Sequence, residues 1–373
     1  MTDLRLGVLA TSRKENEWRL PIHPHHIDRI DKDLLERMVF ESGYGRRFGI
    51  TDDALPAAAS REEVIAGADI VLLPKPTLGD LQSLRDGQVL WGWPHAVQDP
   101  ELTQLAIDKH LTLIAWEAMH HWTDDGEHMV HVFHINNEMA GYCSVLHAMT
   151  LAGTTGHYGR HLRAVILGFG NTARGAVTAL HGLGVHDVTA LTMRDVTAVA
   201  SPIPAVVMEH MHRMDGDPDR IAVHTDAGEI PIGEYLARFD VVVNCVLQDT
   251  DRPMMFVTEE QLSHYPPGHV IVDVSCDRGM GFEWARPTSF EQPAFTVGDG
   301  ISYYAVDHSP SYLWNSATWG ISEALIPFLR PVMDREWGDP TIARAIEIRD
   351  GVIENPKILS FQGRHASHPH PPL

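Results

Sequence analysis

Three residues that could bind and protonate a small carboxylic acid each follow a short apolar run in the first third of the chain. Arg19 lies in the polar stretch "KENEWRLPIHP", Lys75 follows "DIVLLP", and His95 follows "VLWGWP". Hydride transfer at a carbonyl or imine carbon needs a cation for the substrate carboxylate, a polarising group and a proton donor. Each residue alone is more often an ordinary surface cation or histidine. Together, at successive strand ends, they indicate such a site, because parallel α/β sheets bind ligands at the carboxyl ends of their strands.

The apolar runs that position these residues alternate with helix-like segments. Each run ends at a proline, a glycine or a charge, which is typical of strands buried on both faces of a parallel sheet. Between two of them, in "SREEVIAGA", Ser60 could cap a helix together with Glu63. The predicted strands are 5–10, 38–41, 69–73, 88–92 and 112–116. This βαβ alternation predicts an α/β domain.

A second alternating series follows a helix-like segment over 137–150 and a glycine-rich break. Its predicted strands are 163–167, 187–192, 241–245 and 270–274. The later segment "SATWGISEALIPFLRPVM" has helical spacing, and we expect it to pack back on the first domain. The tail from Arg364 is rich in proline and histidine and is predicted to be disordered. The chain is therefore expected to form two α/β domains.

A glycine-rich turn in "RAVILGFGNTARGA" is the clearest single motif. An apolar strand ends at Gly168, which would permit a tight turn, and Gly170 would let the backbone approach a pyrophosphate. A helix pattern starts at Asn171, and the small residue Ala173 allows close packing of that helix on the strand. The alternative is a strand-to-helix turn without a ligand. The strand before the motif and the second strand about twenty residues later favour a dinucleotide site.

The end of that second strand bears on the choice of cofactor. An NAD site usually has Asp or Glu there, whereas an NADP site avoids the acid and supplies an arginine. In "VTALTMRD" the acid position falls on Thr192 or Met193, and Arg194 follows. This favours NADPH, with Arg194 on the 2′-phosphate, over NADH. A shift of one residue would bring Asp195 to the acid position, and an exposed strand-end arginine without a ligand is the other alternative.

Composition excludes several classes of function. The 373 residues are 44% hydrophobic and 21% charged, which suits two globular domains. The formal net charge of −21 argues against a nucleic-acid partner, since such proteins usually carry a basic face. Three cysteines without a CxxC pair indicate a reducing compartment. No signal-peptide core or apolar run long enough for a membrane span is present, so a cytoplasmic protein without a membrane partner is expected.

Other conspicuous residues have simpler interpretations. The histidine clusters "HPHH" and "MHHW" lack an HExxH pattern or a cysteine ligand set, so no metal is expected. Cys276 lies at a strand end without a base partner and is expected to be structural. Trp18, Trp91 and Trp93 flank the predicted pocket. They either contact substrate, as we expect of Trp93, or belong to the core.

Eight segments resemble the superfamily of alanine dehydrogenase, pyridine nucleotide transhydrogenase and saccharopine dehydrogenase. The resemblance extends from residue 1 to about 325 and is strongest to the N5-(carboxyethyl)ornithine synthase branch. That branch is indicated by "NCVLQDT" and "SCDRGMGFE". The segments are "KENEWRLPIHP", "LLPKP", "GWPHAVQD", "FHINNEMAGYCSVLHA", "LGFGNTARGA", "VVNCVLQDTDRPMMF", "VDVSCDRGMGFEWARPTSF" and "YAVDHSPS".

The resemblance implies roles for five residues. Arg19 would bind the carboxylate of the oxo acid, Lys75 would contact the same substrate, and His95 would donate and accept protons. Asp307, followed by His308 where alanine dehydrogenases have an Asp-Asn sequence, would face the nicotinamide. Glu117 would tune the pair of Lys75 and His95, its carboxylate favouring their charged forms.

The implied fold is α/β, with two Rossmann-like domains built on parallel sheets and a cleft between them. Residues 1–136, completed by C-terminal helices within 310–373, would form the substrate domain, and residues 137–309 the NADP-binding domain. The implied reaction is the NADPH-dependent condensation of a pyruvate-like 2-oxo acid with the side-chain amine of ornithine or a related amino acid. Alternatives are reductive amination with ammonia, as in alanine dehydrogenase, and a transhydrogenase-like nucleotide-binding module. Members of the family form homo-oligomers.

Overall fold

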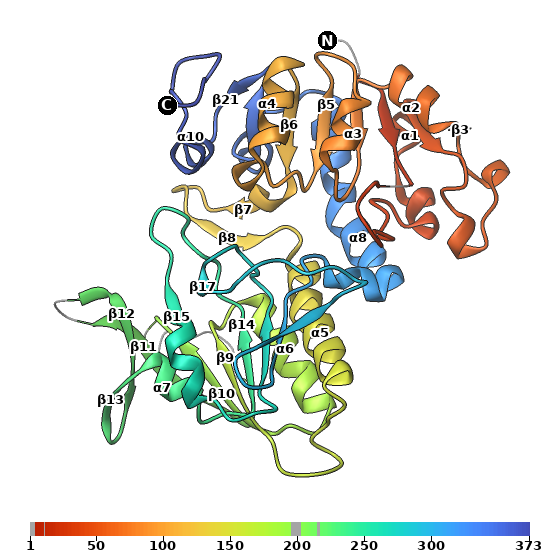
Figure 1. The fold of residues 1–373 in the computed structure, drawn as a ribbon. Helices are drawn as coiled ribbons and strands as arrows, with labels where there is room; N and C mark the ends of the chain where they lie inside the picture. Colours follow the sequence, from red (N-terminus) through yellow and green to blue (C-terminus); the bar gives the residue numbers. More distant parts are fainter. Residues whose placement is uncertain (1–3, 11, 195–202, 215–216) are drawn as a thin grey trace. The chain divides into compact units, whose positions relative to one another are not determined.

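The computed structural model describes residues 4–10, 12–194, 203–214 and 217–373 (Figure 1). It divides into two compact units, the first made of residues 1–134 and 313–373, the second of residues 135–312. The sequence-based division placed the boundaries at 136/137 and 309/310. Helix α5 (His134–Leu151) and the short 3-10 helix η8 (Ser309–Leu313) lie at the two boundaries.

The first unit is built on an eight-stranded sheet in the order β21-β20-β6-β5-β4-β1-β2-β3. Strands β1 to β6 pair in parallel, and β20 pairs antiparallel with both β6 and β21. Chain direction across the sheet reverses between β1 and β4, which is the switch point where α/β sheets bind ligands. The strands are β1 (Leu6–Val8), β2 (Met38–Glu41), β3 (Ala58–Ala59), β4 (Ile70–Leu72), β5 (Val89–Gly92), β6 (Thr112–Ala115), β20 (Ile346–Arg349) and β21 (Val352–Ile353).

Both faces of this sheet are covered. Successive residues of β4 alternate between two apolar clusters, with Ile70 and Leu72 in one and Val71 in the other. This explains the continuous apolar character of the strands. The helices of the unit are α1 (Lys32–Leu35), α2 (Arg61–Gly67), α3 (Leu78–Gln82), α4 (Pro100–Asp108), α8 (Trp314–Met333), α9 (Pro340–Ala343) and α10 (Pro356–Gln362). Short 3-10 helices are η1 (Pro24–Arg29), η2 (Arg46–Phe48), η3 (Asp52–Ala54), η4 (Ala96–Gln98) and η5 (Trp116–Ala118), and a hairpin is formed by β7 (His120–Trp122) and β8 (His128–His131).

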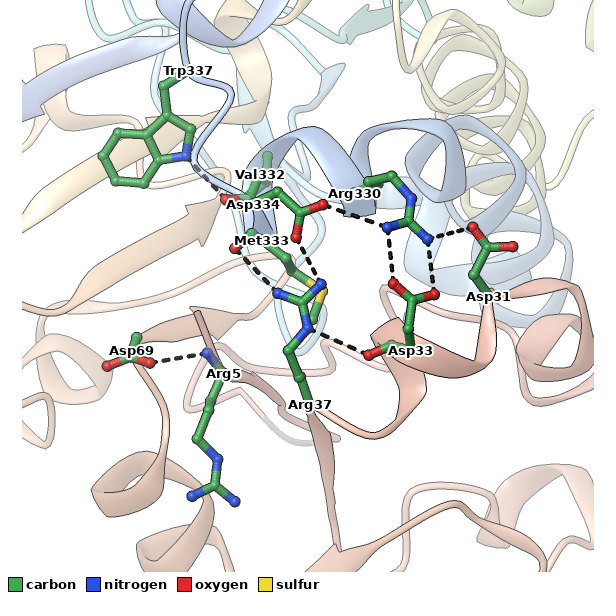
Figure 2. Close-up of polar contacts among 10 residues, drawn as sticks. All are labelled: Arg5, Asp31, Asp33, Arg37, Asp69, Arg330, Val332, Met333, Asp334 and Trp337. Carbon is green, nitrogen blue, oxygen red and sulfur yellow. Dashed lines mark hydrogen bonds and ion pairs between the residues drawn. The ribbon is translucent and has the colours of Figure 1, made fainter. Parts of the chain in front are cut away.

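Helix α8 joins the C-terminal segment to the beginning of the chain. Its residues Ala317, Ile321 and Leu325 recur every four positions and are buried, as expected of an amphipathic helix that packs on a sheet. At its end Arg330 donates both of its terminal nitrogens to Asp33, each at 2.9 Å (Figure 2). Arg330 also contacts Asp31 at 2.8 Å. These ion pairs fix the C-terminal helix beside α1.

The second unit contains a nine-stranded sheet in the order β13-β12-β11-β10-β9-β14-β16-β19-β18. The six central strands, which follow one another in the order β11-β10-β9-β14-β16-β19, pair in parallel. Strands β12 and β13 at one edge and β18 at the other are antiparallel additions. The strands are β9 (Arg163–Leu167), β10 (Asp187–Thr192), β11 (Val206–Met214), β12 (Asp217–Thr225), β13 (Gly228–Pro231), β14 (Val241–Asn244), β16 (Val270–Asp273), β18 (Ala294–Val297) and β19 (Ile301–Tyr304). Helices α6 (Asn171–Gly182) and α7 (Ile232–Leu236), the 3-10 helix η7 (Glu259–His264) and the pair β15 (Met255–Val257) and β17 (Gly281–Phe282) complete the unit.

The prediction of two α/β domains with mainly parallel sheets is confirmed. The prediction of a disordered tail is wrong. Arg364 and His370 are buried, and a β-bridge joins Arg364 to Pro372. The ring of His370 accepts a hydrogen bond from the backbone of Ile353 at 3.1 Å, so the tail is held against the edge strand β21. Over the described ranges, no helix combines the length and apolarity needed to cross a membrane.

Candidate active site

Four candidate residues of the first unit follow adjacent parallel strands. Arg19 comes after β1, Lys75 after β4, His95 after β5 and Glu117 after β6, and these strands are neighbours in the order β1-β4-β5-β6. Their carboxyl ends therefore meet at one edge of the sheet. The sheet topology thus places the four residues as the strand-end argument requires.

Arg19 is almost completely buried and is paired with Glu17, a residue of the same polar stretch. Its Nε lies 2.8 Å from Oε1 of Glu17, and its NH2 contacts the other carboxylate oxygen. Both side chains are less than 4% exposed. The guanidinium carbon also lies 5.0 Å from the centre of the Trp93 ring. Such a two-pronged pair orients the guanidinium before any substrate is present.

The three tryptophans have different environments. Trp91 and Trp93 are buried, and Trp93 packs edge-on against Trp116 with ring centres 4.7 Å apart. These two residues therefore belong to the core, although Trp93 also supports Arg19. Trp18 is 39% exposed, and the guanidinium of Arg47 lies 3.6 Å from its ring centre.

The loop that carries Lys75 is fixed by its neighbours. The hydroxyl of Ser12, in the loop after β1, donates to the backbone oxygen of Lys75 at 2.5 Å. The backbone of Trp93 donates to the oxygen of Pro74 at 2.8 Å. A Cβ atom on Gly92 would lie 1.9 Å from the oxygen of Leu73, so this approach of β5 to the β4 loop requires glycine. Lys75 itself is half-buried.

His95 and Glu117 are joined by a hydrogen bond of the backbone. The amide of His95 donates to Oε1 of Glu117 at 2.7 Å, and the ring Nδ1 lies 3.8 Å from the same oxygen. His95 adopts a left-handed conformation with φ of 49°, which is uncommon for a residue with a side chain. Glu117 therefore stabilises the unusual backbone conformation of His95.

The carboxyl group of Glu117 is electrostatically linked to Glu347 on β20. Burial raises the pKa of both groups, and repulsion by Glu347 raises that of Glu117 further, while Lys75 opposes the increase. One oxygen of each carboxyl group is buried and has no hydrogen-bond partner among the residues that the structure describes. The sequence interpretation missed Glu347, because nothing in "AIEIRD" marks it as a partner of a residue 230 positions earlier. The higher pKa also makes Glu117 easier to protonate than we expected.

The glycine-rich turn of the second unit connects β9 to α6. Gly168 has a φ of 88°, and a Cβ there would lie 3.3 Å from the backbone oxygen of Cys245. A Cβ on Gly170 would meet nothing within 4 Å, so its backbone faces open space at the start of α6. The helix begins at Asn171, and Ala173 is fully buried against the strands. These features fit a pyrophosphate held by the first turn of the helix.

Helix α5 lies directly on α6 in this unit. A Cβ on Gly141 would come within 1.9 Å of the oxygen of Thr172, and one on Gly175 within 1.8 Å of the oxygen of Glu138. Only glycine permits this contact of two helix backbones. It fixes the helix whose first turn would hold the cofactor.

The end of β10 carries no acid at Thr192 or Met193. The buried Thr192 accepts a hydrogen bond from the amide of Arg194 at 3.1 Å, and the Arg194 guanidinium donates to the oxygen of Phe169 at 3.2 Å. Arg194 therefore lies beside the glycine-rich turn. A second cation that the sequence interpretation missed, Arg174, lies 4.7 Å from the centre of the Phe169 ring. Asp195 lies outside the described residues.

Asp307, in the second unit, follows β19. Its Oδ1 lies 2.6 Å from Nδ1 of the buried His308, whose ring packs against Phe290 with centres 4.6 Å apart. The carboxylate of Asp307 is thus oriented by the next residue along the chain. The sequence singled out His308 only as a difference from alanine dehydrogenases.

A buried carboxyl group at the ends of β14 and β16 also escaped the sequence interpretation. Asp273 accepts hydrogen bonds from Asn244 at 2.9 Å, Tyr303 at 2.6 Å and the amide of Cys276 at 3.0 Å. Burial raises its pKa to about 6. Cys276 has a φ of 46°, so Asp273 holds an unusual turn. No group of three or more metal-binding side chains occurs in the parts of the chain that the structure describes.

The linkage between Glu117 and Glu347 predicts a pH-dependent stability. Because burial raises the pKa of Glu347 above its ordinary value of 4.5, the folded state binds this proton more tightly than the unfolded state. Stability of the wild type should therefore fall as pH rises from about 5 to 8. Glu347→Gln removes this loss and keeps an acceptor for Asn355, so its stability relative to the wild type should increase over that range by roughly 1–3 kcal/mol.

Thermal unfolding of wild type and variant at several pH values measures this difference. The matched control is Glu36→Gln, because Glu36 is an exposed glutamate of the same unit. Its unfolding curve should follow that of the wild type at every pH. Parallel pH profiles for Glu347→Gln and the wild type would show that Glu347 is not linked to a proton in this way.

Comparison with known proteins gives the family. Residues 7–140 match the N-terminal domain of the family Alanine dehydrogenase/PNT, and residues 144–356 match its C-terminal domain. Alanine dehydrogenase of Mycobacterium tuberculosis (strain CDC 1551 / Oshkosh) is 24% identical over 96% of this chain and 97% of its own length. The N(5)-(carboxyethyl)ornithine synthase of Clostridium botulinum is 25% identical over 86% of this chain and 92% of its own length.

Solved structures agree on the fold. An L-alanine dehydrogenase superposes with a TM-score of 0.72 at 20% identity, covering 96% of this chain and 99% of its own. The transhydrogenase from Sinorhizobium meliloti gives 0.67 at 20% identity, covering 94% and 99%. The similar identities to alanine dehydrogenase and to the ornithine-type enzyme do not separate the two branches, but the predicted superfamily is confirmed. The chain belongs to the alanine dehydrogenase/PNT family of pyridine nucleotide-dependent oxidoreductases.

Proposed function

We propose that the protein catalyses the NADPH-dependent condensation of a pyruvate-like 2-oxo acid with the side-chain amine of ornithine or a related amino acid. The product would be an N-(carboxyalkyl) amino acid. The observation that carries the proposal is the sheet edge on which Arg19, Lys75 and His95 follow adjacent strands. It offers a cation for the oxo-acid carboxylate, a second cation and a group that exchanges protons.

Each of these residues has a distinct task in the proposed reaction. Arg19, already oriented by Glu17, would bind the carboxylate of the oxo acid. Lys75 would polarise the carbonyl oxygen. His95 would donate and accept protons while the amine adds and the resulting carbinolamine loses water. Glu117 would fix the His95 backbone and, when ionised, favour the charged form of His95, while Trp93 would support the bound carboxylate through Arg19.

The cofactor would be held by residues of the second unit. Gly168, Gly170, Asn171 and Ala173 form the turn that suits a pyrophosphate. Arg194 would bind the 2′-phosphate, which the neutral Thr192 would not repel. Bound nicotinamide would supply the hydride that reduces the imine carbon. By family resemblance, Asp307 would lie against the nicotinamide, oriented by His308.

Amination with ammonia is the main competing activity, because alanine dehydrogenases are among the relatives. It predicts a preference for NADH, which the arginine after Thr192 disfavours. Oxidation of NADPH and NADH should be measured with pyruvate plus ammonia, ornithine, lysine or arginine in separate assays. We expect turnover with NADPH and a diamino acid and little with ammonia. Equal rates with ammonia would overturn the condensation, and reduction of one nucleotide by another without an oxo acid would favour the transhydrogenase-like alternative.

Arg194→Gln tests the choice of cofactor. Loss of the guanidinium should raise the KM for NADPH by roughly 10- to 100-fold, as expected for a charge-assisted contact to phosphate, and leave the KM for NADH nearly unchanged. Steady-state kinetics with both nucleotides measures the split. The control is Arg160→Gln. Arg160 pairs with Asp240 beside the amino ends of β9 and β14, whereas the glycine-rich turn follows the carboxyl end of β9. An equal loss for NADPH and NADH would remove Arg194 from the 2′-phosphate.

His95→Asn tests proton transfer without disturbing the backbone. Asparagine tolerates the left-handed conformation of this position better than alanine, and it cannot act as a general base. We expect kcat to fall by roughly 10²- to 10⁴-fold, while the Kd for NADPH stays within about twofold of the wild type. Nucleotide fluorescence and single-turnover assays measure both quantities. Turnover near the wild-type rate would exclude His95 from proton transfer.

A further inference from the structure

A cavity of about 170 Å³ in the first unit is lined by three arginines together with apolar, acidic and hydroxyl side chains. Arg13, Arg61 and Arg85 contribute them, and Glu62, Ser83 and the apolar side chain of Ile65 complete most of the wall. The proposed reaction uses none of these residues. Three arginines against one glutamate give the wall an excess of positive charge, in a chain whose net charge is −21.

Two of the guanidinium groups are oriented by other parts of the protein. Arg61 lies 2.7 Å from Asp80 and 3.5 Å from Glu41, both of which are buried. Arg85 donates to the oxygen of Ala68 at 2.6 Å. These two buried acids balance, from behind, the two positive charges that Glu62 leaves on the wall, and they hold Arg61 in one orientation. The lining is therefore organised before a ligand binds, which lowers the entropy cost of binding.

The third arginine, Arg13, lies beside a serine hydroxyl, which is a second kind of donor. Arg13 is 59% exposed at its side chain, and its NH2 lies 3.5 Å from the hydroxyl of Ser83. Guanidinium groups with a serine hydroxyl form a donor set that matches the oxygens of a phosphoryl group. A volume of about 170 Å³ suits a phosphate or a small phosphate ester and is too small for a dinucleotide. We propose that this cavity binds the phosphoryl group of a small anion.

The same cavity is connected to two of the strand-end loops. Asp80 accepts hydrogen bonds from the amide of Arg13 at 3.2 Å and from the amide of Thr77 at 2.9 Å. Arg13 lies in the loop that carries Arg19, and Thr77 follows Lys75 by two positions. A bound phosphoryl group that draws the exposed Arg13 side chain towards it would shift the loop that carries Arg19 and change the KM for the oxo acid. This consequence rests on the proposed function, whereas the binding itself does not.

Calorimetric titration of the full chain with inorganic phosphate and with glycerol 3-phosphate, at constant ionic strength and saturating NADPH, tests the binding. Tighter binding of the ester than of free phosphate would identify a phosphorylated metabolite as the ligand, and the reverse order would identify phosphate. The double variant Arg13→Gln/Arg85→Gln should bind the better ligand at least tenfold more weakly. Arg85→Lys keeps the charge without the planar fork and should give an intermediate loss.

The control is Arg5→Gln, because Arg5 is an exposed arginine outside the cavity. The hydrogen bond to Asp69 seen in Figure 2 comes from its backbone nitrogen and is kept in the variant. This variant should bind phosphate like the wild type. Unchanged thermal unfolding without ligand shows that each variant is folded. Absence of binding to the wild type, equal binding to succinate, or unchanged affinity in the double variant would overturn the proposal. Loss of phosphate binding in Arg194→Gln or Arg19→Gln instead would assign the anion to the cofactor turn or the strand-end site.

Discussion

Hydrogen bonds between loops hold the ends of four parallel strands together, and the candidate active site depends on them. The Ser12 hydroxyl ties the loop after β1 to Lys75, and the Trp93 amide ties the loop after β5 to the residue before Lys75. The amide of His95 then joins the same loop to Glu117 after β6. Because buried backbone groups must be paired, each loop is fixed by its neighbour. The geometry of the candidate site is thus a property of the whole sheet edge.

The buried Glu17 and the half-buried Glu117 at this edge serve different electrostatic purposes. Glu17 is paired with the Arg19 guanidinium, and this ion pair offsets part of the cost of burying the positive charge. Glu117 is close to Lys75 and His95 but also to Glu347, and burial raises its pKa. One acid therefore stabilises a fixed positive charge, while the other can gain or lose a proton near neutral pH. The proposed reaction, which binds a carboxylate and transfers protons at this edge, would use both.

Local sequence patterns predicted the elements whose stability is local. Strands 163–167 and 187–192 have the predicted bounds, since apolar runs between turn residues describe buried parallel strands well. The antiparallel strand β20 and the buried Glu347 were missed, because they depend on pairing with β6, more than 200 residues earlier. The ordered tail was missed for a related reason, because Arg364 and His370 are polar residues whose contacts include the distant partners Gln104 and Ile353. The ion pair of Arg19 with Glu17 was also missed, although the two residues are only two positions apart. The sequence "EWR" carries no signal of the bent loop that brings their side chains together.

The net charge of −21 is compatible with anionic ligands because charges act locally. At physiological ionic strength the Debye length is about 8 Å, so distant carboxylates contribute little at a binding site. A bound phosphate or carboxylate therefore interacts mainly with the nearest guanidinium. Each candidate anion site has a guanidinium that is oriented by a neighbouring group. Arg19 is oriented by Glu17, and Arg194 by the oxygen of Phe169. Arg61 is oriented by Asp80 in the same manner. In an acidic protein, the fixed orientation of a few arginines therefore matters more for anion binding than overall charge does.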